Sequence, residues 1–200
     1  MRPVVIGALV VAFMVGAVPS GQAQYEGARV AVTDLDFDDP LSPSFRTGVL
    51  GVTGTRQNWL QIALEYETDA EDGEWINEIV LQWTVALTAE GKRPVLMRRR
   101  VTYRSIEDGD HYAVMYVRPK FIQHYFDRDT VRDNDIRVYL EILADGNRAT
   151  RFRYPERGRR AWWQAGEPNV IIRDDELLTR NETPFAPLEY DYYEHIIPQP

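Results

Sequence analysis

The segment from Trp75 to Leu87 (WINEIVLQWTVAL) constrains the fold most, because apolar side chains recur at every second position. In the row that contains Leu81 and Trp83, only Asn77 is polar. Successive strand side chains point to opposite faces, so this row predicts a strand with one buried face. A helix would place Leu81 on the solvent side, and the β-branched and aromatic content also favours a strand. Because the segment exceeds the usual strand length of about 3–10 residues, we expect a bulge near Asn77.

Other segments alternate in the same way and predict further strands. Asp-Gly pairs between several of them indicate the tight turns of hairpins. The further strands are expected at 28–35, 58–68, 95–104, 111–118, 136–143 and 149–154, with a short edge strand as an option at 48–53. One short helix is predicted from Pro119 to about 127–129, where Phe121, Ile122, Tyr125 and Phe126 form an apolar stripe.

This order of elements predicts a mostly β fold. About seven to eight strands follow one another without alternating helices, which favours an immunoglobulin-like antiparallel β-sandwich with the helix inserted before the penultimate strand. The chain has no cysteine, so the Cys…Trp…Cys signature of antibody domains is absent. The C-terminal segment, about 160–200, is too aromatic for a disordered tail. We expect it to lie extended along the domain or along a neighbouring subunit.

The first 23 residues have the features of a signal peptide. Arg2 precedes an apolar stretch at 4–18, and Gly21-Gln22-Ala23 has the small-x-small pattern of a cleavage site. Cleavage would leave one domain at 24–200, either periplasmic or secreted, with the cell surface as a further location and no membrane insertion. The alternative is a retained N-terminal anchor.

Net charge and composition exclude several classes of binding partner and cofactor. The formal net charge of −8 argues against nucleic acid and against anionic lipid surfaces, both of which attract Lys and Arg. The absence of cysteine excludes a thiol nucleophile, a zinc-thiolate site and a c-type haem attachment. We expect no cofactor.

Three aspartates could offer oxygen ligands to calcium. Asp34, Asp36 and Asp38 would lie on one strand face, but the segment lacks the ligand spacing of an EF-hand. Charged residues also protect an edge strand, and we prefer that interpretation. The three histidines show no recognisable ligand spacing. We therefore predict no metal site, with these aspartates as weak calcium candidates.

No residue set predicts catalysis. The sequence contains no Gly-x-Ser-x-Gly elbow, and its many carboxylates do not single out a glycosidase pair. We therefore expect a protein that is not an enzyme, with a small hydrolase as the third possibility.

Basic and aromatic groups are the candidates for an interaction surface. Arg98 and Arg100 would share the solvent face of a strand, either paired with carboxylates such as Glu65 or Glu78 or free to bind an acidic partner. Aromatic and arginine side chains are enriched at protein interfaces, which adds Trp162, Trp163, Tyr190, Tyr192 and Tyr193. These rings could also close the end of the core, or form the sugar platform of a carbohydrate-binding module. A long hydrophobic edge would add contacts between subunits by strand addition.

Two segments carry a family resemblance. They are Asp110–Pro119 (DHYAVMYVRP) and Leu177–Pro187 (LLTRNETPFAP). In both, the chain resembles the immunoglobulin-like exported proteins that are encoded beside type IV pilus-like components in Verrucomicrobia. The resemblance implies an immunoglobulin-like domain in the periplasm or at the surface, associated with pilus-like assembly and able to self-associate. It implies no catalytic residues.

Overall fold

The computed structural model describes residues 29–43, 56–70, 75–156, 162–163, 169–188 and 196–197. These ranges contain seven long strands, two short strands, one α-helix and three 3-10 turns. The strands are β1 (Arg29–Asp38), β2 (Leu60–Asp69), β3 (Ile76–Leu87), β4 (Val95–Ile106), β5 (Gly109–Val117), β6 (Ile136–Ala144), β7 (Asn147–Tyr154), β8 (Ile171–Ile172) and β9 (Leu177–Thr179). The helix is α1 (Pro119–Phe126), and the 3-10 turns are η2 (Asp133–Asp135), η3 (Asp174–Glu176) and η4 (Arg180–Glu182).

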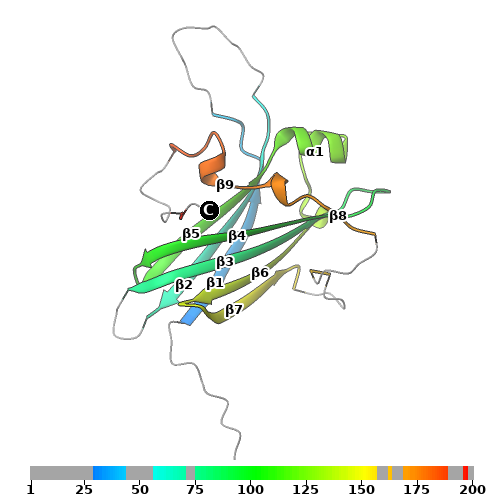
Figure 1. The fold of residues 1–200 in the computed structure, drawn as a ribbon. Coiled ribbons are helices and arrows are strands. Elements are labelled where there is room, and N and C mark those ends of the chain that lie inside the picture. Colours follow the sequence, from blue (N-terminus) through cyan, green and yellow to red (C-terminus); the bar gives the residue numbers. More distant parts are fainter. Residues whose placement is uncertain are drawn as a thin grey trace, which may run out of the picture.

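The strands form two sheets that pack face to face (Figure 1). The first sheet has the order β1-β2-β5-β9, and the second has the order β7-β6-β3-β4-β8. All seven long strands pair antiparallel, whereas β8 pairs parallel with β4. The predicted β-sandwich with one helix is thus confirmed, and the parallel pair involves only the two-residue strand β8.

The core lies between the inner rows of the two sheets. Leu81, Trp83 and Val85 of β3 face Leu60, Ile62 and Leu64 of β2, and all are buried in one apolar cluster. Trp83 is 1% exposed, so the prediction that its ring lies in the core is confirmed. Burial of large side chains from two facing sheets provides most of the driving force for this fold.

The irregularities of the sheets lie elsewhere than expected. The bulge predicted near Asn77 is wrong, because the register between β3 and β4 does not shift there, although the pairing skips Asn77 opposite Ser105, whose φ is 56°. Register shifts occur instead in β1, between Val32 and Asp34, and in the β6–β7 hairpin, between Ile142 and Leu143. Both shifts are in pairs that involve an edge strand, where bulges are most common.

Helix α1 closes one end of the sandwich through Tyr125. The Tyr125 hydroxyl donates to the Arg93 carbonyl at 2.6 Å and accepts from the Ala89 amide at 3.3 Å. Lys92 in the same turn donates to the Tyr125 carbonyl at 2.7 Å and pairs with Asp127. Burial raises the pKa of the Tyr125 phenol, so it stays protonated and able to donate. These bonds fix the β3–β4 turn to the helix.

The C-terminal segment, in its described part at 169–188 and 196–197, lies on its own sandwich. It crosses the end of the sandwich near α1 and adds β8 to the edge strand β4 and β9 to the edge strand β5 (Figure 1). Ile196 then returns to β4, where it forms a bridge with Tyr103, and the Ile197 amide donates to the Thr102 carbonyl at 2.9 Å. The segment therefore covers both sheet edges on this side, which removes backbone groups that would otherwise template pairing with another chain.

Candidate functional site

The outer face of the β1-β2-β5 sheet is acidic. The inner row of β2 is apolar, so its carboxylates point outward, and the cross-strand register places those of β1 and β5 beside them. Seven exposed carboxylates share this surface with one arginine, Arg29. We call it the acidic face, and its carboxylates are Asp34, Asp36, Asp38, Glu65, Glu67, Asp69 and Asp110.

Within the acidic face, like charges stand directly opposite one another. Asp34 pairs with Glu65, and Glu67 pairs with Asp110. Opposed like charges on neighbouring strands cost stability, on the order of 0.2–1 kcal/mol for each pair. Such pairs are relieved by a cationic partner, so the face is better suited to being covered by positive charge than to facing water.

The outer face of the other sheet is basic. Here core residues occupy the inner rows of β3, β4, β6 and β7 except at Arg99, and arginines fill much of the outer rows. We call this surface the basic face. Its seven exposed arginines are Arg98, Arg100, Arg104, Arg137, Arg148, Arg151 and Arg153, against the three partly buried carboxylates Glu78, Glu141 and Asp174.

Some of these arginines are paired, and others are not. Arg98 forms a two-pronged ion pair with Asp174, whose hydrogen bond and charge raise the pKa of Arg98. Glu141 pairs with Arg151 at 3.3 Å and with Arg148 at 3.6 Å. Among the described residues, Arg100, Arg104, Arg137 and Arg153 have no ion pair. The excess of guanidinium groups leaves the face positive in a protein whose net charge is negative.

The predicted partners of Arg98 and Arg100 are not the ones found. Glu65 lies on the opposite sheet, and Glu78 stands across from Arg104. Asp174 instead reaches Arg98 from η3, because β8 places this turn beside β4. No local sequence pattern indicates this contact, because Arg98 and Asp174 are 76 positions apart in the chain.

The predicted aromatic residues are only partly described. Trp162 and Trp163 are both half-buried. Trp163 stacks on Tyr139 of the basic face, with ring centroids 4.4 Å apart and planes at 3°, and Trp162 meets Trp163 edge to face at 5.7 Å. Tyr190, Tyr192 and Tyr193 lie outside the described residues. One face of Trp163 is thus already occupied by Tyr139, which leaves less ring surface for a sugar.

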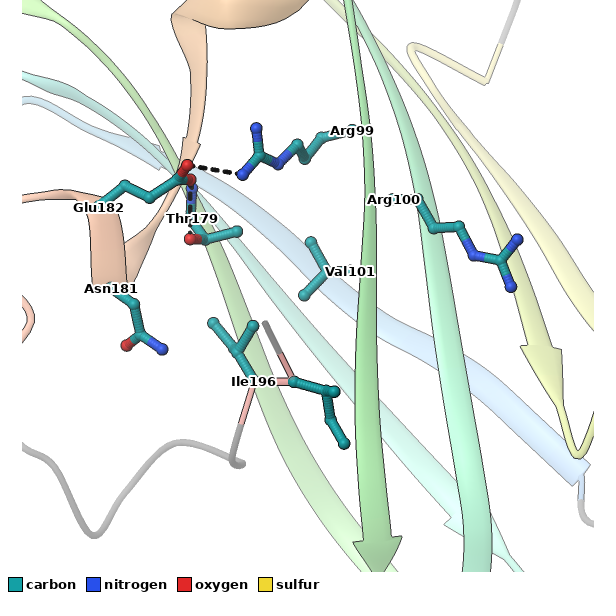
Figure 2. Close-up of a pocket in the computed structure, with 8 residues that line it drawn as sticks. Arg99, Arg100, Val101, Thr179, Asn181, Glu182 and Ile196 are labelled. Atoms are coloured by element: carbon teal, nitrogen blue, oxygen red, sulfur yellow. Dashed lines mark hydrogen bonds and ion pairs between the residues drawn. The ribbon is translucent and has the colours of Figure 1, made fainter. Parts of the chain in front are cut away.

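A small pocket of about 250 Å³ lies where the C-terminal segment meets β4 (Figure 2). Arg99, on the inward row of β4, donates to Glu182 of η4 at 2.6 Å, and Ile196 lines the apolar side. Arg100 points away from it, toward the basic face (Figure 2). The second carboxylate oxygen of Glu182 accepts bonds from the Thr179 amide at 2.8 Å and hydroxyl at 2.9 Å. The pocket therefore lies beside the ion pair between Arg99 and Glu182, which connects β4 of the second sheet to the turn that follows β9 of the first.

The stability that the Arg99–Glu182 ion pair provides should depend on pH, because Glu182 must be ionised to form it. Burial acts to raise the pKa of Glu182, but the bonds from Thr179 and the charge of Arg99 outweigh it, so the pKa lies below its ordinary value of 4.5. A carboxyl whose folded pKa is lowered stabilises the fold above its unfolded pKa, and this contribution is lost as pH falls through the folded pKa.

We therefore expect Glu182→Gln to lower the free energy of unfolding by roughly 0.5–1 kcal/mol near neutral pH, a modest value because the side chain is partly exposed. The difference from the wild type should shrink toward zero below the ordinary pKa of 4.5. Urea unfolding across this pH range measures it, with the exposed Glu90→Gln as control. A deficit that persists unchanged in acid would show that the ionised carboxylate has no such role.

Among the described residues, no group of three or more His, Asp or Glu side chains could hold a metal ion. Asp34, Asp36 and Asp38 do share one exposed row, as expected, but two of them accept bonds from the next residue's amide, Asp34 from Leu35 and Asp38 from Asp39. None of the helices in the described ranges has the length and apolar character needed to cross a membrane.

The two segments that carried the family resemblance are neighbours in the fold. Residues 110–119 contain most of β5, and residues 177–187 contain β9, and the two strands pair through Tyr116 and Leu178. Phe185 stacks on Tyr116 with ring centroids 4.8 Å apart. Together with Trp59 they form a second buried cluster on the outer side of the first sheet. The two segments of the resemblance thus coincide with the attachment of the C-terminal segment to the first sheet.

Comparison with known proteins places the chain in one family. A protein-family model matches residues 21–199. A crystal structure of a protein from Akkermansia muciniphila superposes with a TM-score of 0.76 at 19% identity, covering 86% of this chain and 95% of that chain. At this identity the similarity shows the fold alone. No curated protein matches the sequence significantly.

Proposed function

Because the chain belongs to the family whose model spans residues 21–199, we propose that it is an exported, non-enzymatic interaction or assembly protein associated with a type IV pilus-like system. The observation that carries the proposal is the separation of charge onto two broad outer faces of one sandwich. Two pockets on the described residues lie beside ion pairs, one of about 250 Å³ at Arg99 and Glu182 and a shallow one at Arg98 and Asp174. Broad charged faces suit contact with another protein.

The strand order supports an immunoglobulin-like type. Strands β1, β2 and β5 correspond to A, B and E of that fold, and β3, β6 and β7 correspond to C, F and G. Strand β4 pairs with β3 in the second sheet. In constant-type domains, by contrast, the fourth strand belongs to the first sheet. An immunoglobulin-like domain is a common binding scaffold, and the resemblance in 110–119 and 177–187 favours a role beside pilus-like components.

Strand addition is the less favoured mode of contact. The C-terminal segment covers β4 and β5, so β1 and β7 are the open edges among the described residues. Both carry charged side chains on their outer rows, a pattern that discourages edge pairing. A carbohydrate-binding module built on Trp162 and Trp163 is also less favoured, since both rings are half-buried against each other and Tyr139.

In-cell photocrosslinking tests this function. A photoreactive residue at Thr84, in the middle of the basic face, should form a protein adduct in the exported fraction of cells that produce the protein. The same residue at Glu90, in the β3–β4 turn, is the control and should give none. Monomer bands alone at both positions, or recovery of the protein only in the cytoplasm, would overturn the proposal.

A further inference from the structure

The acidic and basic faces lie on opposite sides of the same molecule. They are the outer surfaces of two sheets that share one core, so each points directly away from the other (Figure 1). The acidic face of one copy is therefore complementary in charge to the basic face of another copy. Charge complementarity steers association and fixes which faces meet.

We propose that a second copy of this chain is the occupant of the basic face, and that it docks there through its acidic face. This rests on the proposed function and names its partner. The contact is heterologous, because two different surfaces meet, so each copy keeps one free face for the next. Stacking therefore continues in one direction instead of stopping at a dimer.

The charged groups without partners support this pairing. Arg100, Arg137 and Arg153 of the basic face are exposed and have no ion pair among the described residues. The acidic face offers the opposed carboxylates of Asp34 with Glu65 and of Glu67 with Asp110. Guanidinium groups bind carboxylates bidentately, so arginines from a second copy would neutralise these pairs.

The size of the acidic face sets the strength of the contact. Three strands spaced about 4.8 Å apart and about 30 Å long cover roughly 400 Å², which is an upper bound because the buried cluster around Phe185 occupies one end of this side of the sheet. Two faces of this size bury about 800 Å² in total, less than the roughly 1,200–2,000 Å² of stable complexes. The association is therefore weak, reversible and sensitive to ionic strength, and lateral support from other components would strengthen it.

A mixing experiment tests the stacking. The first variant, Arg100→Gln/Arg137→Gln/Arg153→Gln, lacks charge on the basic face, and the second, Asp36→Asn/Glu65→Gln/Glu67→Gln, lacks charge on the acidic face. Each keeps the other face intact. In about 20 mM salt, where exposed charges are weakly screened, each variant alone should sediment as a monomer, and their mixture should form a one-to-one dimer that cannot extend.

Two control variants remove equal charge elsewhere. Arg93→Gln/Lys120→Gln/Arg132→Gln and Glu90→Gln/Glu107→Gln/Asp129→Asn alter exposed residues outside both faces, and each should associate as the wild type does. A monomeric mixture, or loss of association in the controls as well, would overturn the stacking. A photocrosslinked adduct with a different protein, alongside a monomeric mixture, would retain the proposed function and reject self-stacking alone.

Discussion

Deletion of residues 169–200 should leave the protein aggregated or unfolded. The deletion removes β8 and β9 and takes Leu177, Leu178 and Phe185 out of the two apolar clusters. It also uncovers the edges of β4 and β5, whose free backbone groups would pair with other chains. Size-exclusion chromatography and circular dichroism of the truncated protein measure the outcome.

A matched pair of substitutions tests whether the C-terminal segment stabilises the fold through its buried side chains. Leu178→Ala, at 3% exposure, should lower the free energy of unfolding by about 2–5 kcal/mol. Leu188→Ala, at 43% exposure in the same segment, should change it by less than about 0.5 kcal/mol. A truncated protein that stays folded and monomeric, or equal effects of the two substitutions, would show that the segment is not part of the domain.

Trp83→Ala should destabilise the sandwich by about 3–5 kcal/mol, a large fraction of the roughly 5–15 kcal/mol that stabilises a typical domain. The ring is 1% exposed and lies in the centre of β3, which pairs with β4 on one side and β6 on the other. Its removal leaves a cavity that two regular sheets cannot collapse to fill. Urea denaturation gives the free energy of unfolding.

Trp75→Ala provides the control for this substitution. Trp75 precedes the same strand but is 57% exposed, so its removal should cost less than about 0.5 kcal/mol. Similar losses for the two tryptophans would contradict a core built around Trp83, since the effect would then not depend on burial.

The long strands were predictable because each one carries its own pattern. Alternation in β2 and β3 placed the apolar rows correctly, and Pro119 marked the start of α1. The strands β8 and β9 were not found, because two or three residues are too short to show a period. Their positions depend on pairing with β4 and β5, far away in the chain, and no local pattern records such a contact.

The candidate surfaces were predictable only in pieces. Asp34, Asp36 and Asp38 were recognised as one exposed row, and Arg98 and Arg100 as another. The sequence could not show that the acidic rows are neighbours in one sheet while the basic rows share the other, since this depends on which strands pair. The charge separation therefore depends on the strand order of the two sheets. It shows that the acidic and basic rows are parts of two opposed faces and not isolated solvated patches.

Sedimentation velocity of the unmodified protein at two salt concentrations tests the opposed faces most directly. At a protein concentration of about 100 μM, suited to a weak interface, the weight-average mass should exceed that of a monomer in about 20 mM salt and return to the monomer in about 500 mM salt. A monomer in both solutions, or a mass that rises with added salt as apolar contacts would require, would contradict association through the acidic and basic faces.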